Sequence, residues 1–283
     1  PIAIRFIGNV TDPSVLTKGD LVLDTVTAGM TIEGIGSDAT ANGYGIVLKN
    51  CVDVEVRNIG FMNCNSSEGD NCGLQQNDSY CWVHNCDFFY GDAGSDADQA
   101  KGDGALDTKK SHHITHSYNH FFDNGKCNLQ GANASDTSNY ITYHHNWFDH
   151  SDSRHPRVRV ATVHVYNNYY DGNSKYGIGS TTDSDIFAEN NYFRNCKYPM
   201  LTSKQGSDDA TGGTFSGEVG GVIKAYGNII EGAKAFVPYS ENPSAYDAYV
   251  ASSRDEKVPS SVKAISGGAS YNNFDTASDF YSY

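Results

Sequence analysis

The sequence lacks several features that define other structural classes. No apolar run approaches the ~20 residues that a membrane-spanning helix needs, and no window offers ten residues of helical periodicity. The first residues, PIAIRFIGNV, lack the basic start and long apolar core of a signal peptide. We therefore expect no helical bundle, no membrane partner, and a sequence from which any leader is already absent.

Positive charge is also scarce. The chain has 20 Lys and Arg against 34 Asp and Glu, a formal net charge of −14. Such an acidic protein is a poor general binder of nucleic acid, so we expect no nucleic-acid partner. An anionic substrate would require the cations to be concentrated locally, and seven of the 20 lie between residues 101 and 159.

The seven cysteines form no recognisable zinc-ribbon spacing. Their odd number leaves at least one thiol unpaired. Four of them fall between residues 64 and 86, which fits either local disulfides in a secreted protein or small buried side chains. Both readings stay open for Cys51, Cys64, Cys72, Cys81, Cys86, Cys127 and Cys196.

Glycine and tyrosine are abundant, at 29 and 19 residues, while only 7 residues are proline and only 19% are charged. This mixture is typical of an all-β protein with many turns. Short β-rich runs at 2–6, 21–23, 30–34 and 45–50 are separated by turns rich in Gly and Asp. They predict strands from the N-terminus onward.

From Val54 onward the runs align as a repeat. In each unit, large apolar or aromatic residues stand five before and two after a reference position, such as Trp82 and Phe89 in the second unit. Successive reference positions are 28, 32, 27, 22, 23 and 37 residues apart, and a minimum near 22 with variable insertions is typical of a solenoid. The reference residues are Ile59, Asp87, Asn119, Asn146, Asn168, Asn191 and Asn228.

The strand-like period favours a parallel β-helix over a leucine-rich or helical repeat. Asparagine recurs at the reference position, which fits side-chain amides that stack from coil to coil and satisfy turn backbone groups. A β-sandwich with accidental similarity is the alternative. We expect one domain over residues 1–283, with side loops and a C-terminal tail packed on the coils, including a short helix between Pro243 and Lys257.

The charged residues fall into register with the repeat. Lys126 and Arg154 follow their reference asparagines by seven and eight residues, which places them side by side on neighbouring strands ~4.8 Å apart. The carboxylates of Asp70, Asp103 and Asp107 precede them in the chain. Adjacent like charges are unfavourable without an anionic partner. The pattern therefore predicts a polyanion-binding groove beside an acidic cluster, against the alternative of a solvated surface.

Two further arginines extend this row. Arg157 and Arg159 alternate with Val158 and Val160, so period two predicts that both arginines point outward and both valines inward. Histidines are also frequent here, and we favour structural roles for them, with His145 as a stacked corner residue. They are His112, His113, His144, His145, His150, His155 and His164.

These motifs resemble a known family. GDGALDTKK, DNGKCNLQG, ITYHHNWFDHSDSRHPRVR, VHVYNNYY and ENNYF, in this order, are similar to the motif series of pectate lyases over roughly Met30 to Tyr239. That family consists of secreted, right-handed parallel β-helix enzymes that cleave polygalacturonate by β-elimination. The resemblance implies a secreted, extracellular protein of this fold and activity that acts on polygalacturonate or pectin, and we expect it to be a monomer.

The resemblance also implies roles for individual residues. Arg154, the first arginine of RHPRVR, resembles the family's Brønsted base, while Lys126 and Arg159 resemble the cations that hold substrate carboxylates. Arg157 lies in the same row and is predicted to bind substrate with them. Because a guanidinium rarely loses its proton, we expect an alkaline activity optimum.

Calcium is the cofactor that the resemblance implies. Asp103 and Asp107 resemble two of the carboxylates that bind it, and Asp70 falls near a third acidic position. The sequence departs from the family pattern near Asp70 and Cys72. It also lacks the Asp of the usual Trp-x-Asp-His, since it reads Trp82, Val83, His84, Asn85. These departures predict a weaker dependence on calcium.

Other functions remain to be separated by experiment. A pectin lyase that acts on methyl-esterified chains would not need the cations and acids, and a polygalacturonase would hydrolyse with paired acids. A non-catalytic carbohydrate-binding β-helix would keep the repeat without the cation row. The open row of coils favours endo action, with unsaturated oligogalacturonides as products.

Overall fold

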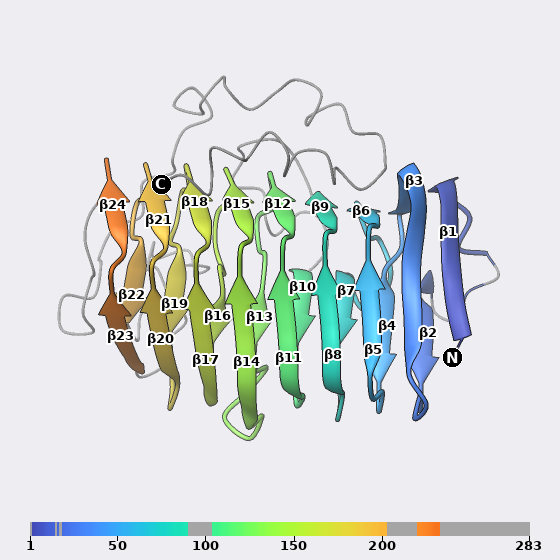
Figure 1. The fold of residues 1–283 in the computed structure, drawn as a ribbon, viewed down its shortest axis with the longest axis horizontal. Helices are drawn as coiled ribbons and strands as arrows, with labels where there is room; N and C mark the ends of the chain where they lie inside the picture. The colour runs from blue at the N-terminus through green and yellow to red at the C-terminus, as the bar shows by residue number, and fades with distance from the viewer. Residues whose placement is uncertain (1, 15, 17–18, 90–103, 203–219, 233–283) are drawn as a thin grey trace.

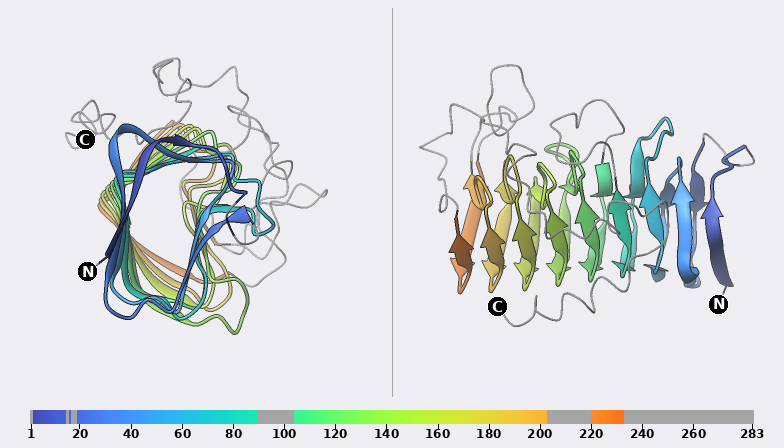
Figure 2. Two further views of the ribbon diagram at one scale, coloured as in Figure 1. Left: turned by 90° about the vertical axis from the view of Figure 1, so that its right-hand side faces the viewer. Right: turned by 90° about the horizontal axis from the view of Figure 1, so that it is seen from above.

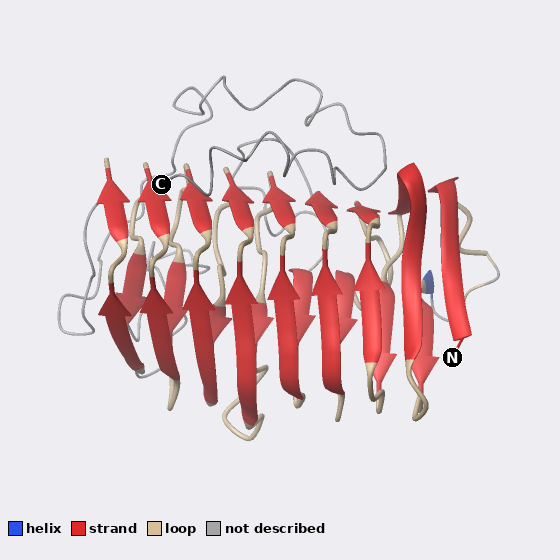
Figure 3. Ribbon diagram, viewed as in Figure 1, coloured by secondary structure: helices blue, strands red, loops and turns tan. Residues whose placement is uncertain are grey.

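The computed structural model describes residues 2–14, 16, 19–89, 104–202 and 220–232. In these ranges every regular element longer than a single turn is a β-strand (Figure 3). The strands stack as successive coils of a right-handed parallel β-helix, blue at the N-terminal end and orange at the last described coil (Figure 1). Viewed along the stack, the coils superimpose around one common interior (Figure 2).

Three parallel faces form the walls of the coils. Face A begins with the first half of β3 (Met30–Asn42), and face B begins with its second half, because this long strand pairs with β5 and then with β6. The edge strand β1 (Ile2–Val10) pairs only with β3 among the described strands. Face A continues through β5 (Val54–Arg57), β8 (Ser79–His84), β11 (His112–Ser117), β14 (Ser138–His144), β17 (Ala161–Tyr166), β20 (Asp185–Glu189) and β23 (Val222–Tyr226).

Faces B and C complete each coil. Face B continues through β6 (Gly60–Met62), β9 (Asp87–Phe89), β12 (His120–Phe122), β15 (Trp147–Asp149), β18 (Tyr169–Asp171), β21 (Tyr192–Arg194) and β24 (Ile229–Glu231). Face C consists of β2 (Leu21–Asp24), β4 (Ile46–Lys49), β7 (Asp70–Leu74), β10 (Gly104–Thr108), β13 (Leu129–Gln130), β16 (Arg157–Val158), β19 (Ile178–Ser180) and β22 (Met200–Thr202).

The interior is filled by columns of like residues from successive coils. One column consists of aromatic rings that stack face to face, with centroids 4.2 to 5.1 Å apart. Each ring is fully buried, so each contributes about 1.5–3 kcal/mol from burial alone. The column runs through Phe61, Phe88, Phe121, Phe148, Tyr170 and Phe193.

The predicted asparagine stack is confirmed. The side-chain carbonyl of Asn146 accepts from both the backbone and the amide of Asn119, each at 3.1 Å, and the amide of Asn146 donates to Asn168 at 2.9 Å. The same contacts continue to Asn191 and Asn228. The ladder therefore satisfies buried backbone groups at the corner between faces A and B.

The alignment of the second unit was wrong by one residue. Cys81, not Trp82, pairs with Ile114, and the backbone of Cys86, not that of Asp87, meets the side chain of Asn119. Because side chains alternate along a strand, this slip reverses the face of every residue in the unit. Phe88 therefore joins the interior column, and Trp82 lies outside with 40% of its surface exposed.

The prediction for the two valines near β16 was half correct. Val158 is fully buried in the core, as expected. Val160 is not a core residue, because the strand ends at Val158 and Val160 lies in the following turn with a left-handed φ of 51°. Alternation holds only within a strand.

Of the two alternatives for the cysteines, the structure supports small buried side chains. All seven are free and buried, and burial raises the pKa of Cys64 to about 11 and that of Cys81 to about 12. The predicted helix at 243–257 and the C-terminal tail lie outside the described residues. Among the described residues, no helix is long and apolar enough to cross a membrane.

Candidate active site

The predicted acidic residues that the structure describes lie on adjacent strands of face C. Asp70 begins β7 and Asp107 lies in β10, and both side chains are fully buried. Gly104 is the register partner of Asp70, and a Cβ at Gly104 would stand 2.5 Å from the Asp107 carboxylate. The glycine therefore makes room for that carboxylate. Asp103 lies outside the described residues.

A lysine from the same strand region joins the two carboxylates. Lys109 Nζ lies 3.2 Å from Asp70 Oδ2 and 3.9 Å from Asp107 Oδ2. A third carboxylate, Glu68 Oε1, lies 3.5 Å from the same nitrogen. Burial is the largest influence on Lys109 and lowers its pKa, but the three carboxylates together outweigh it, and the pKa lies above its usual value.

Glu68 is a site residue that the sequence analysis missed. It precedes β7 by two residues and contacts Lys109 and Gln75. The only sequence signal was that Glu68 is an acidic residue two positions before Asp70. That signal is weak, because the sequence does not show in which direction the turn places the Glu68 side chain. The structure therefore defines an oxygen-rich cluster of Glu68, Asp70 and Asp107 around one cation.

We predict that Lys109→Met destabilises the protein in calcium-free buffer by about 2–3 kcal/mol, because it leaves buried carboxylates without this counter-charge. The measurement is urea unfolding in the presence of EDTA. Lys110→Met is the matched control, since the Lys110 side chain is exposed. Equal losses in the two variants would contradict the assignment of Lys109 as the counter-ion.

The predicted cations follow on the next two coils. Lys126 forms an isolated parallel bridge with Ser153, so Arg154 stands one position further along the neighbouring coil. The Asn128 backbone donates to the Arg154 carbonyl at 2.7 Å. Lys126 and Arg154 are 9% and 7% exposed, so the row is more enclosed than the predicted outer surface. Desolvation strengthens the electrostatic interactions of such cations.

Arg157 and Arg159 flank the end of β16. Arg157 pairs with Leu129 on one side and Gly179 on the other and is 4% exposed. Arg159 Nη1 donates to the backbone carbonyls of Gly131 and Ala132, at 3.1 and 2.6 Å. One end of the Arg159 guanidinium is therefore tied to the turn of the preceding coil.

The Asp107 carboxylate is linked to the cation-bearing coil. Its Oδ1 accepts from the Leu129 backbone at 2.8 Å, and Leu129 lies three residues after Lys126. The thiol of Cys127 lies close enough to Asp107 and Arg154 for both charges to act on its pKa, which burial raises above its usual value. Acids and cations thus occupy four successive coils of face C.

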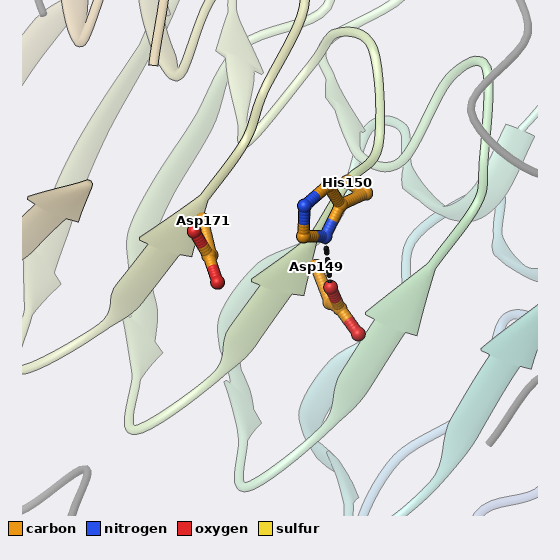
Figure 4. A group of neighbouring side chains, drawn as sticks. All are labelled: Asp149, His150 and Asp171. Atoms are coloured by element: carbon orange, nitrogen blue, oxygen red, sulfur yellow. Dashed lines mark hydrogen bonds and ion pairs between the residues drawn. The ribbon is translucent and has the colours of Figure 1, made fainter. Parts of the chain in front are cut away.

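A second charged cluster lies where the chain leaves face B. Asp149, His150 and Asp171 come together there, with His150 Nδ1 bonded to Asp149 (Figure 4). The other oxygen of Asp149 lies 3.2 Å from His120 Nε2, and Arg194 binds both oxygens of Asp171. Imidazole or guanidinium groups engage both oxygens of Asp149 and both oxygens of Asp171, and nitrogen is a poor ligand for calcium, so we interpret this cluster as a hydrogen-bonded charged network rather than a calcium site.

Comparisons with known proteins identify the family to which this parallel β-helix belongs. The model of the pectate lyase family matches residues 19–269. The chain therefore belongs to the pectate lyase family, as the motifs implied. It is 30% identical over 204 residues to the pectate trisaccharide-lyase of Bacillus licheniformis, covering 71% of this chain and 58% of that protein.

Solved structures give the same result. Pectate lyase Bsp165PelA from Bacillus sp. N165, in complex with trigalacturonate, superimposes with a TM-score of 0.68 and 26% identity over 93% of this chain and 84% of that chain. Pectate lyase C from Erwinia chrysanthemi, at pH 9.5 with 30 mM Ca2+, has a TM-score of 0.62 and 29% identity over 74% and 57%. The chain thus spans little more than half the length of several relatives.

Proposed function

We propose that the protein is a pectate lyase that cleaves α-1,4-linked polygalacturonate by β-elimination. The observation that carries this proposal is the succession of Asp70, Asp107, Lys126 and Arg154 on neighbouring coils of face C. A polyanion whose carboxylates repeat along its length matches a row of cations that repeats along the coils. Family membership and the similarity to a trigalacturonate-bound structure support it.

In the proposed mechanism, Arg154 removes the proton on C5 of a galacturonate residue. The electron pair of that C–H bond forms the C4–C5 double bond, the C4–O bond breaks, and the leaving oxygen takes a proton from solvent. Lys126, Arg157 and Arg159 hold substrate carboxylates and stabilise the charge that develops beside C5. The products would be unsaturated oligogalacturonides, and the open row of coils favours endo action.

Calcium fits the oxygen-rich cluster. Glu68, Asp70 and Asp107 already surround a cation, the ammonium of Lys109, and hard carboxylate oxygens are the ligands that calcium prefers. Asp103 would complete the set. When bound, calcium would supply positive charge near the substrate carboxylate. Because the Trp-x-Asp-His motif is changed here, we propose a weaker calcium requirement than is usual in the family.

The proposal is tested by absorbance near 235 nm, the band of the unsaturated uronide product, on addition of polygalacturonate. We expect activity to rise from about pH 7 to about pH 10, because only the neutral guanidine is a base and its usual pKa lies above 12. Chelation by EDTA should lower the rate, and calcium should restore it. A maximum below pH 7 would contradict Arg154 as the base.

The same assay separates the alternatives. Preference for highly methyl-esterified pectin would identify a pectin lyase, and no absorbance rise between about pH 7 and 11, with or without calcium, would leave a carbohydrate-binding β-helix. The proposed substrate is a plant cell-wall polysaccharide, so we propose that the protein acts outside the cell. We also propose that it is a monomer. Gel filtration of the purified protein checks the monomer.

A further inference from the structure

The backbone at Arg154 adopts a conformation that arginine disfavours. Its φ is 65°, in the left-handed region, which costs a residue with a Cβ roughly 1–2 kcal/mol. Among the described residues, 21 residues other than glycine have a left-handed φ, and 11 of them are Asn or Asp, such as Asn167 and Asn190, whose short polar side chains tolerate it. The conformation at Arg154 therefore persists only because its surroundings hold it.

The preceding part of the turn is fixed to the neighbouring coil. The backbone of Asp152 donates to Asn124 at 2.8 Å, and that of Ser153 donates to Gly125 at 3.1 Å. Further back, the imidazole of His150 lies against Gly172, where a Cβ would stand 2.5 Å from the ring. The segment that precedes Arg154 is therefore held in place by contacts with the neighbouring coils.

The following residue, His155, is anchored in the core. It is fully buried, and its Nδ1 lies 2.7 Å from the carbonyl of Tyr176, so Nδ1 carries the proton and donates. Its ring contacts Phe148 edge-on at 5.1 Å. Burial lowers the pKa of His155 to about 3, so the ring stays neutral throughout the range in which the enzyme would act.

A second interior residue holds the carbonyl of His155. The Tyr170 hydroxyl donates to it at 2.9 Å. The Tyr170 ring is itself fixed in the aromatic column, between Phe148 at 4.9 Å and Phe193 at 4.2 Å. Burial holds the pKa of Tyr170 well above its usual value, so this donor survives at alkaline pH.

We propose that His155 and Tyr170 are positioning residues for Arg154. The core holds the imidazole of His155, and Tyr170 holds the peptide that follows His155. Together they fix the residue next to Arg154, and so the left-handed backbone from which the guanidinium projects. Neither residue needs to touch the substrate. The inference rests on the proposed role of Arg154 as the base, and it concerns the geometry of that residue alone.

The first test compares two buried tyrosines in the holoenzyme with calcium present. Tyr170→Phe removes the hydroxyl that holds His155, and we expect kcat to fall about 10-fold with KM changed less than twofold. Tyr143→Phe is the matched control, because Tyr143 is also fully buried and its hydroxyl bonds to Gln130 at 3.4 Å. Equal kcat values for the two variants would overturn the proposal.

Conservative rescue gives a second readout. An asparagine amide can reproduce the donor at Nδ1, so His155→Asn should retain more of kcat than His155→Ala. A purely structural role predicts that the two variants lose activity only in proportion to the folded fraction. Circular dichroism and the thermal midpoint supply that fraction, and activity that tracks it in both variants overturns the proposal.

A double-mutant cycle separates this inference from the proposed function. If Tyr170 acts through Arg154, adding Tyr170→Phe to Arg154→Lys should lower the residual kcat less than twofold. A further 10-fold fall in the double variant would overturn the positioning role. Full activity of Arg154→Lys alone would instead refute Arg154 as the base, while leaving the Tyr170 comparison as a separate result.

Discussion

Replacing Arg154 with lysine should lower kcat on polygalacturonate by about 10³-fold, within the range of 10²–10⁴ for loss of a general base. Lysine keeps the positive charge but is shorter and lacks the planar guanidine. The substrate should still bind, because Lys126, Arg157 and Arg159 are untouched. Initial rates at 235 nm give kcat, and calorimetric titration with an oligogalacturonate gives the binding constant.

The control for this change is Arg57→Lys. Arg57 lies on face A, its side chain is 43% exposed, and it pairs with Glu33 at 2.8 Å. Its replacement should leave kcat within twofold of the starting protein. Loss of binding in Arg154→Lys with kcat preserved at saturation would instead make Arg154 a substrate-holding cation, and another residue would have to serve as the base.

The repeat could be predicted from the sequence because successive coils of a β-helix carry apolar residues in the same pattern. Apolar residues at fixed offsets from the corner asparagine had to stack, since each coil can bury them only against its neighbours. The same register placed Lys126 beside the segment that carries Arg154, and the bridge between Lys126 and Ser153 agrees to within one residue. The positions of Lys126 and Arg154 along neighbouring coils could therefore be predicted from the period of the repeat.

Periodicity could not predict which of two neighbouring residues in a strand points into the interior. The second unit offers two neighbouring phenylalanines, Phe88 and Phe89, and both alignments place an aromatic residue inside. The residue at the corner is Cys86 rather than Asp87, since the Cys86 backbone donates to the Asn119 side chain, although both side chains are buried. Trp82 looked like a core residue, but it is 40% exposed, and its indole N–H donates to the hydroxyl of the buried Ser117.

Turns were the other source of error. Val160 and Arg159 lie where β16 has already ended, so alternation no longer controls their direction. The Arg159 guanidinium bonds to carbonyls of the preceding coil, and Glu68 reaches Lys109 from a turn. Such contacts depend on φ values and loop paths that a repeat pattern does not encode.

The second large effect concerns the asparagine ladder. Asn146→Ala should destabilise the protein by about 4 kcal/mol, since Asn146 takes part in four buried side-chain hydrogen bonds worth about 1 kcal/mol each. The change removes the acceptor of the Asn119 backbone N–H and of one of the two Asn119 amide bonds, and it removes the side-chain donor to the His116 carbonyl. The urea midpoint measures the loss.

Asn139→Ala is the control in the same coil, because Asn139 is exposed, and we expect a change within about 0.5 kcal/mol. Asn146→Asp distinguishes hydrogen bonding from packing, since aspartate keeps the shape but introduces a buried charge and loses the amide donor. It should be less stable than the alanine variant at neutral pH and recover partly in acid, where the carboxyl is protonated. An aspartate variant as stable as the original protein would mean that the corner needs only volume at this position, and the ladder would then be a result of stacking rather than one of its causes.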